Sequence, residues 1–376
     1  MKTRAALLER TGAPLVICEL DLAPPGVGEV LVRIVASGVC HSDLNAIDGT
    51  AETLCPAVLG HEGAGIVEAI GEGVARVRVG DSVALSWSPS CGACAECVRD
   101  LPWLCTSARA AMNDGLLPGG TSRLSRDGEP VFHYSCLSTF AERAVVAETS
   151  CVVVPEGVPL DVAALVGCAV TTGVGSVWNT AGVRPGDSVA VIGCGGVGLS
   201  AVMAAVAAGA EPVVAVDTEP RKLAAAESFG AAHALAWQGT PEATAEAIRE
   251  LTGGGVDHAI EATGREEAML AAVMATRTRG SAVLIGIPRV GTVIPVPALA
   301  IQGGERRIIG SVYGSAKPER DFVAIFALYR AGRLPLDRLI SHRLPLERIQ
   351  QAFALLTSGE ALRAIVDPTL AEVKAA

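Results

Sequence analysis

The sequence predicts an α/β fold that combines a strand-rich domain with a doubly wound parallel-sheet domain. Three observations lead to this prediction. Short β-rich runs, broken by glycine and proline, fill roughly the first 165 residues. Strand and helix patterns then alternate from about Pro185 onward, as in βαβ units. Beyond Tyr313 the pattern changes again to amphipathic helices.

Composition and charge indicate a globular protein that does not bind large polyanions. The 376 residues suggest two or three domains, and a content of 50% hydrophobic and 19% charged residues excludes disordered and fibrous chains. The formal net charge is −10, and the sequence contains no basic tract. We therefore expect neither nucleic acid nor an anionic membrane surface as a partner.

The first residues carry charges and contain no apolar stretch of signal-peptide length, so we expect a cytoplasmic protein. Two uncharged stretches, 162–183 and 188–210, would pass a crude filter for membrane spans. Glycines and a change from strand to helix pattern interrupt both stretches. We therefore expect them to lie in the protein core.

The strand-rich part is typified by residues 28–40 and 63–74, and no helical period is sustained there. In the following array, the strands are expected at 187–196, 212–217, 257–264 and 280–288. Residues 197–209 and 220–230 read as the intervening helices, and 321–334 and 346–361 as the late amphipathic helices. This alternation predicts a parallel sheet.

Four of the eleven cysteines lie in one short segment with the spacing Cys-x2-Cys-x2-Cys-x7-Cys. These four residues are Cys91, Cys94, Cys97 and Cys105. Four soft ligands in one loop can close a tetrahedron around Zn²⁺, so the motif predicts a structural zinc site. An iron–sulfur cluster is the competing interpretation, but its bacterial motif continues with a fourth cysteine after three residues and then proline. This loop has neither feature.

A glycine-rich turn follows the first strand of the array and matches the pattern G-x-G-x-x-G. Its glycines are Gly193, Gly195, Gly196 and Gly198, and Asp217 ends the next strand. The backbone N–H groups of such a turn bind a pyrophosphate, and the acid accepts hydrogen bonds from the adenosine ribose. A purely structural turn is the alternative. Because a carboxylate repels a 2′-phosphate and no arginine follows directly, NAD is predicted rather than NADP.

Cys40, His61 and Cys168 come from three distant segments, and each ends an apolar run at an expected glycine-rich turn. Taken singly, each is more often structural than functional. Together, two thiolates and one imidazole supply three zinc ligands and leave a fourth position open. That is the composition of a catalytic zinc site.

With these motifs, the chain resembles the zinc-dependent medium-chain alcohol dehydrogenases over almost its whole length. The matching elements are the GHE-x2-G run at 60–65, the Cys-His-Ser-Asp run at 40–43 and the four-cysteine loop. Residues 119–142 look like the extended loop of the dimeric animal-type and glutathione-dependent formaldehyde dehydrogenase branches. The resemblance therefore implies a homodimer.

The resemblance also implies a division of the chain and a set of cofactors. A GroES-like catalytic domain would comprise residues 1–169 and 313–376, and a Rossmann NAD-binding domain residues 170–312. Each subunit would bind NAD and two zinc ions, one catalytic and one structural. The substrate would be a small-molecule alcohol or aldehyde. Hydride would pass reversibly between that substrate and NAD.

For the catalytic residues, the resemblance implies that Cys40, His61 and Cys168 bind the catalytic zinc, with Glu62 behind it and able to approach it. Asp43 would orient His61, and Ser42 would accept the proton of the alcohol. For the cofactor, it implies that Thr172 and Val197 flank the nicotinamide, Lys222 joins Asp217 at the adenosine ribose, and His41 and Arg363 contact the pyrophosphate. For His41 and Arg363, solvated surface charge remains an alternative.

The substrate pocket departs from the family pattern. Asn45 occupies the position where a titratable histidine or tyrosine often passes the proton to solvent. Trp87 stands where a smaller aromatic is common, which favours a bulky primary or aromatic alcohol. Arg109 instead favours an anionic S-(hydroxymethyl)thiol, as in formaldehyde oxidation. A non-enzymatic nucleotide-binding protein or a quinone reductase on this fold would lack the zinc motifs.

Overall fold

The computed structural model describes residues 1–370, which divide into two compact units. The first unit comprises Met1–Cys168, Lys317–Arg330 and the residues from Leu336 onward. The second comprises Ala169–Ala316 and Ala331–Pro335. The chain thus leaves the first unit after Cys168, returns to it at Lys317, and contributes one further short segment, Ala331–Pro335, to the second unit.

A closed barrel forms the base of the first unit. Its strands pair in the order β1-β2-β7-β8-β4. They are β1 (Lys2–Leu8), β2 (Val16–Leu22), β7 (Leu124–Arg126), β8 (Glu129–His133) and β4 (Ala57–Val58). Leu7, Leu20 and Val131 are among the buried side chains that fill it. Closure leaves these strands without a free edge.

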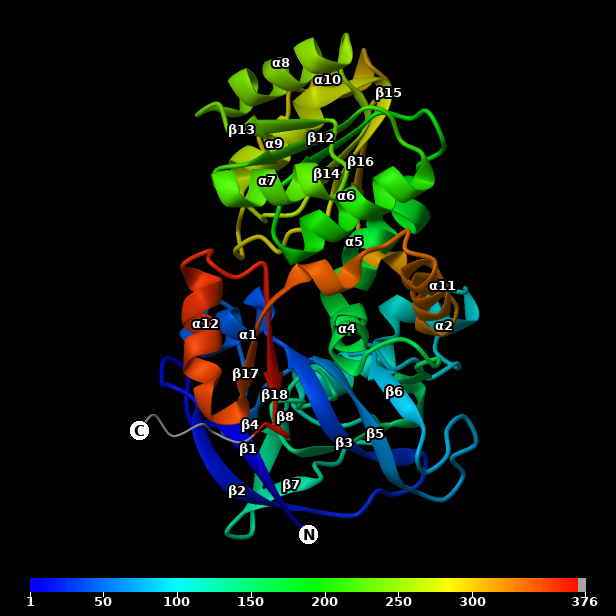
Figure 1. Cartoon of the computed structure of the whole chain (residues 1–376), viewed down its shortest axis with the longest axis vertical. Coiled ribbons are helices and arrows are strands. Elements are labelled where there is room, and N and C mark those ends of the chain that lie inside the picture. The colour runs from blue at the N-terminus through cyan, green and yellow to red at the C-terminus, as the bar shows by residue number, and fades with distance from the viewer. Residues whose placement is uncertain (371–376) are drawn as a thin grey trace. The chain divides into compact units, whose positions relative to one another are not determined.

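A second sheet of the first unit joins the two ends of the chain. Its order is β10-β6-β5-β3-β18-β17, and β9 pairs with β3. The strands are β3 (Glu29–Gly38), β5 (Glu62–Ile70), β6 (Ser82–Leu85), β9 (Arg143–Ala147), β10 (Cys151–Val153), β17 (Ile340–Pro345) and β18 (Arg363–Asp367). Figure 1 shows the red C-terminal β18 beside the blue β3, where Ile365 pairs with Gly38. This pairing brings Arg363 next to residues some 300 positions earlier.

The second unit is built on a parallel sheet in the order β13-β12-β11-β14-β15-β16. These strands are β11 (Val189–Ile192), β12 (Val213–Asp217), β13 (His233–Ala236), β14 (Val256–Glu261), β15 (Thr276–Leu284) and β16 (Arg307–Gly310). If the six strands are numbered 1 to 6 along the chain from β11 to β16, their order in the sheet is 3-2-1-4-5-6, which is the order of a dinucleotide-binding sheet. The predicted doubly wound sheet is confirmed.

Alternate residues of the central strand explain why helices cover both faces of this sheet. Ala190 and Ile192 pack in one cluster with Ile248 and Ala271, which lie on helices. Val191 faces the other way and is equally buried. Such strands read as continuous apolar runs because neither face meets water. The covering helices are α6 (Gly196–Ala208), α7 (Pro220–Ser228), α8 (Pro241–Thr252) and α9 (Glu266–Ala275) (Figure 1).

The remaining helices include several that the sequence pattern did not predict. The two late amphipathic helices are present as α11 (Pro318–Arg330) and α12 (Ile349–Thr357), and α10 (Ala298–Gln302) is a short addition. Besides α8 and α9 of the second unit, the unpredicted ones lie in or next to the strand-rich part: α1 (His41–Asp48), α2 (Ala95–Val98), α3 (Thr106–Asn113), α4 (Leu160–Leu165) and α5 (Thr171–Gly175). Most are too short to show a helical period.

Cys168 corrects one expectation, because it lies inside a helix and not at a glycine-rich turn. Two π-helical segments, Val166–Val170 and Ser176–Ala181, join α4 and α5 into the stretch Leu160–Ala181. Among the described residues this is the one helix long and apolar enough to span a membrane, and 78% of its most apolar window is buried in the protein. A Cβ on Gly167 would lie 2.6 Å from the carbonyl oxygen of Leu85, so glycine here serves close packing.

Candidate active site and cofactor site

The four-cysteine loop closes into a compact set of sulfur ligands. The Sγ atoms of Cys91 and Cys97 are 4.0 Å apart, and those of Cys94 and Cys105 are 3.9 Å apart. A tetrahedral site with zinc–sulfur bonds of about 2.3 Å requires about 3.8 Å between sulfurs. The backbone N–H of Cys91 also donates to the sulfur of Cys105, at 3.4 Å. The loop therefore fits a structural zinc ion.

A second ligand cluster lies in the first unit, where three predicted segments meet. One donor atom from each of Cys40, His61, Glu62 and Cys168 lies within 4.8 Å of all the others. Cys40 precedes α1, His61 and Glu62 lie at the start of β5, and Cys168 comes from the π-helical segment. Two sulfurs and one imidazole nitrogen, with a carboxylate behind them, fit a catalytic zinc ion with an open position.

Asp43 ties two of these segments together. One carboxylate oxygen accepts from the backbone N–H of Cys40 at 3.2 Å. The other lies 3.1 Å from the backbone nitrogen of Gly60 and 3.0 Å from Nδ1 of His61. With Nδ1 held in this way, the buried Nε2 of His61 has no hydrogen-bond partner among residues 1–370. A buried, unpartnered imidazole nitrogen beside two thiols is the arrangement expected of a metal ligand.

Glu62 forms a buried ion pair with Arg363. Burial raises the pKa of Glu62 to about 7, although the neighbouring guanidinium opposes this effect. The hydrogen bond with Cys168 lowers the pKa of the Cys40 thiol well below its usual value, against the effect of burial. Arg363 was expected at the pyrophosphate of the cofactor. The structure places it behind the ligand cluster, on β18, with 3% of its surface exposed.

One aromatic side chain contacts the ligand cluster, and a second follows a strand that packs against it. The Tyr134 ring meets the His61 ring edge-on at 5.7 Å, and its hydroxyl donates to the carbonyl oxygen of Ser42 at 2.9 Å. Trp87 lies two residues beyond Leu85, whose carbonyl oxygen closely approaches the backbone next to Cys168. Sequence reasoning singled out Trp87 but missed Tyr134, because no short motif contains it.

In the second unit, the glycine-rich turn joins β11 to α6. A Cβ on Gly198 would lie 1.7 Å from the carbonyl oxygen of Gly193, so the turn and helix can approach only with glycine there. At Gly195 a Cβ would meet no atom within 4 Å, and α6 begins at the next residue, Gly196. This exposed backbone at a helix N-terminus fits a pyrophosphate.

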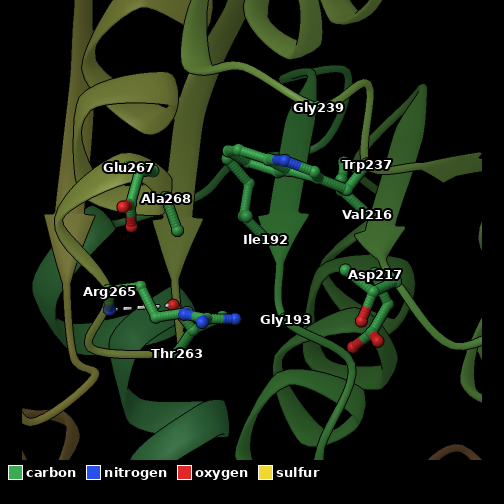
Figure 2. A pocket seen from close by; sticks show the side chains of 11 residues that line it. Ile192, Gly193, Val216, Asp217, Trp237, Gly239, Thr263, Arg265, Glu267 and Ala268 are labelled. Atoms are coloured by element: carbon green, nitrogen blue, oxygen red, sulfur yellow. Dashed lines mark hydrogen bonds between the residues drawn. The ribbon is translucent and has the colours of Figure 1, made fainter.

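A pocket of about 290 Å³ opens beside this turn (Figure 2). Gly193 and Asp217 line it, as the dinucleotide motif predicts. Asp217 accepts hydrogen bonds from the backbone N–H groups of Cys194 at 2.7 Å and Glu219 at 2.9 Å, which fix its carboxylate. Trp237, Arg265 and Glu267 also line the pocket, and sequence reasoning named none of them. The volume suits part of a dinucleotide.

The other predicted cofactor and substrate residues differ in their contacts and exposure. A Cβ on Gly173 would lie 2.2 Å from the carbonyl oxygen of Val197, so Thr172 and Val197 belong to segments in close contact. Lys222 lies on α7 but does not line the pocket. His41 begins α1 and Arg109 lies on α3, and both are exposed.

A doubly wound dinucleotide-binding sheet and a two-thiolate, one-imidazole ligand set are the two components expected of a zinc-dependent dehydrogenase. Two family models match the chain. The model of the alcohol dehydrogenase GroES-like domain matches residues 26–156, and that of zinc-binding dehydrogenases matches residues 196–328.

Individual relatives extend over the whole chain. The S-(hydroxymethyl)glutathione dehydrogenase of Synechocystis sp. is 40% identical over 97% of this chain and 100% of that protein. The enzyme of the same name from Escherichia coli is 38% identical with the same coverage. The crystal structure of benzyl alcohol dehydrogenase from Acinetobacter calcoaceticus is 34% identical, with a TM-score of 0.93 over 98% of this chain and 99% of that one.

A fourth match is an alcohol dehydrogenase zinc-binding domain protein from Burkholderia ambifaria, 38% identical, with a TM-score of 0.94 over 98% of this chain and 99% of that one. The chain therefore belongs to the zinc-dependent medium-chain alcohol dehydrogenase family. It is an oxidoreductase of a family that uses NAD and zinc.

Proposed function

We propose that this enzyme interconverts a primary alcohol carrying a bulky or aromatic group with its aldehyde, using NAD. The observation that carries the chemistry is the largely buried Cys40–His61–Cys168 cluster, in which Nε2 of His61 has no hydrogen-bond partner among the described residues. Bound there, zinc supplies a Lewis acid that lowers the pKa of a substrate hydroxyl towards neutrality.

The surrounding residues of the chain have separate tasks in this proposal. Ser42, whose Oγ lies 3.8 Å from Sγ of Cys40, accepts the proton of the alcohol. Asp43 fixes the orientation of His61 through its hydrogen bond to Nδ1. Glu62 stays behind the ligands, paired with Arg363. In this proposal the orientation of each side chain relative to the substrate contributes to catalysis together with its chemical group.

We assign cofactor binding to residues of the second unit, Lys222 among them, and to two further cationic side chains, His41 and Arg363. We propose that Gly193, Gly195, Gly196 and Gly198 hold the pyrophosphate and that Thr172 and Val197 flank the nicotinamide. Asp217, with Lys222 nearby on α7, binds the adenosine ribose. His41 and Arg363 remain candidates for pyrophosphate contacts. For Arg363 this role requires leaving its ion pair with Glu62.

Trp87 and Tyr134 favour the bulky or aromatic substrate. The Tyr134 ring packs against His61, and Trp87 follows the strand that approaches the Cys168 helix. An aromatic substrate packed against such rings would bury apolar surface and could adopt the edge-to-face or offset-stacked geometry that aromatic pairs prefer. A solved relative named benzyl alcohol dehydrogenase is 34% identical to this chain, and the match covers 98% of it.

A second candidate substrate is an S-(hydroxymethyl)thiol with a carboxylate. The curated relatives at 40% and 38% identity are named S-(hydroxymethyl)glutathione dehydrogenase. Arg109 supports this candidate because its exposed guanidinium could pair with the carboxylate of such an adduct.

The ratio of kcat/KM for benzyl-type alcohols to that for S-hydroxymethyl thiols distinguishes the two candidates. We expect the unaltered enzyme to prefer the benzyl-type alcohol. In Arg109→Ala, loss of one charge-assisted contact would cost an anionic adduct about 2 kcal/mol, or roughly thirtyfold, and leave a neutral alcohol unchanged. A preference for the adduct that disappears in Arg109→Ala contradicts our order of candidates.

We also propose a homodimer in the cytoplasm. Strand β16 lies at one end of the parallel sheet, and Ile287, Val290 and Leu299, shortly before it, are strongly exposed. An open edge strand beside apolar side chains is typical of an interface. All eleven cysteines are free, as in a reducing compartment. A monomeric mass in light scattering would contradict the dimer.

The predicted division into a catalytic domain (1–169 and 313–376) and a nucleotide domain (170–312) remains a proposal. It is supported by the two compact units, whose main boundaries fall near Ala169 and Ala316, although Ala331–Pro335 belong to the second unit.

A further inference from the structure

A short run of left-handed backbone lies just before the chain leaves the second unit at Ala316. Tyr313, Gly314 and Ser315 have φ angles of 55°, 64° and 50°. Glycine tolerates this conformation, but the Cβ atoms of tyrosine and serine make it strained. Strained residues persist only where neighbouring groups hold them, so this left-handed turn depends on its contacts.

Two side chains from the second π-helical segment hold the left-handed turn. Nδ2 of Asn179 donates to the carbonyl oxygen of Gly314 at 3.2 Å. Oγ1 of Thr180 lies 2.8 Å from Oγ of Ser311 and 2.9 Å from Oγ of Ser315. A hydroxyl both donates and accepts, so Thr180 can donate to one serine and accept from the other. Its hydroxyl therefore connects the residues on both sides of Gly314.

The left-handed turn also packs directly on α5, with almost no space between the two backbones. A Cβ on Gly314 would lie 2.6 Å from the carbonyl oxygen of Thr171 and 2.8 Å from that of Thr172. A Cβ on Gly175 would lie 2.3 Å from the carbonyl oxygen of Gly314. The two glycines thus allow the turn to touch the helix. Because backbones packed in this way leave no room, a shift of the turn requires a shift of α5.

We propose that Thr180 is a positioning residue for hydride transfer and acts on Thr172 through the left-handed turn. Thr172 is the residue of α5 that we assign to the nicotinamide, so this inference rests on that part of the proposed function. By binding Ser311 and Ser315, the Thr180 hydroxyl keeps the turn in its strained form, and the turn fixes α5. Binding of the nicotinamide half of the cofactor therefore depends on Thr180. Binding of the adenosine half, at the glycine-rich turn, does not.

The first test compares NADH with ADP-ribose, which lacks the nicotinamide, by calorimetry on the zinc-loaded enzyme. Thr180→Val removes the hydroxyl at similar volume and should weaken NADH binding about tenfold but ADP-ribose binding less than about twofold. Thr180→Ser keeps the hydroxyl and should return NADH binding to within about threefold of the unaltered enzyme. The matched control, Thr252→Val, removes a hydroxyl that donates to the carbonyl oxygen of Ile248 on α8. Both affinities should stay unchanged in this control.

The second test follows amide hydrogen exchange of the enzyme without cofactor, by mass spectrometry on peptides that span 311–316. The backbone N–H of Ser315 donates to the carbonyl oxygen of Val312 at 2.9 Å, so this amide reports whether the left-handed turn is formed. In Thr180→Val the segment should exchange about tenfold faster, and in Thr180→Ser at nearly the original rate. The experiment needs neither substrate nor cofactor, so it tests the turn independently of the proposed function.

Unchanged exchange in Thr180→Val overturns the role of the hydroxyl at the left-handed turn. Equal weakening of NADH and ADP-ribose binding overturns the link to the nicotinamide, as does normal NADH binding together with faster exchange. An unaltered enzyme that binds NADH no more tightly than ADP-ribose contradicts the assignment of Thr172 and, with it, this proposal. That result identifies the cofactor assignment as the error, whereas the other results identify Thr180.

Discussion

Ser42 and Asn45 occupy the two positions through which a proton would leave the candidate active site. Both lie on α1, and the carbonyl oxygen of Ser42 accepts the hydroxyl proton of Tyr134 in a hydrogen bond. Because Asn45 cannot titrate, we propose Ser42 as the first group of the chain to take the proton. The contact of Tyr134 is with the backbone of Ser42 and not with its hydroxyl.

Ser42→Ala should lower kcat about a hundredfold, which is the lower range for loss of general acid–base catalysis. Steady-state kinetics with the best alcohol measure this effect, and zinc content should be unchanged. Asn45→His should speed proton release at low buffer concentration and shift the pH profile of kcat. A Ser42→Ala enzyme with normal turnover would exclude Ser42 from the proton path.

At the scale of elements, the two ligand sets depend on different kinds of structure. The four-cysteine loop contains α2, only four residues long, with no buried side chain in it. Cys40, His61 and Cys168 instead lie on or beside α1, β5 and the long central helix, which pack into buried cores. Metal binding therefore contributes to local folding in the loop and mainly to catalysis in the cluster.

Metal analysis of the unaltered enzyme should give about two zinc ions per chain, one for each ligand set. Cys168→Ala should retain about one ion and nearly the same melting temperature, with activity lost. Cys94→Ala should also lose one ion but melt at a lower temperature, because the loop has little other support. The assignment of the two sites is wrong if Cys168→Ala unfolds the protein and Cys94→Ala leaves its stability unchanged.

Local motifs made much of the fold and of the candidate site predictable. The parallel sheet followed from apolar runs such as 212–217, and Gly193 to Gly198 marked the dinucleotide turn. The helical position of Cys168 could not be foreseen, since the helix packs at Gly167 against Leu85, a residue far away in the sequence. Trp237 and Arg265 lie on different segments, and only the order of the strands brings them together.

At the scale of the whole molecule, a buried histidine makes stability depend on pH. His133 ends β8 in the barrel, and its Nε2 accepts from the backbone N–H of Arg123 at 3.2 Å. Burial lowers the pKa of His133 to about 3, and the positive charge of Arg123 adds to this effect. The neutral ring is thus part of the folded structure, whereas the unfolded chain takes up a proton near pH 6.5.

The free energy of unfolding should therefore fall as the pH decreases from about 6.5 towards 3, by up to about 5 kcal/mol for this residue. Denaturant titrations at several pH values measure the loss. His133→Gln, whose side chain can also accept from Arg123, should flatten the curve between pH 6 and 4. The control His342→Gln, on half-exposed β17, should keep the original slope. Parallel curves for the unaltered protein and His133→Gln would contradict this prediction.

The hydrogen bonds of Asp43 bear on how the enzyme exchanges its metal. The carboxylate joins the Cys40 and His61 segments through hydrogen bonds to protein groups, so part of the order of the site comes from the chain itself. Binding energy at such a site is not consumed in ordering the chain. We therefore expect that a chelator removes the catalytic ion from a folded enzyme and that cobalt or cadmium can replace it as a spectroscopic substitute without refolding.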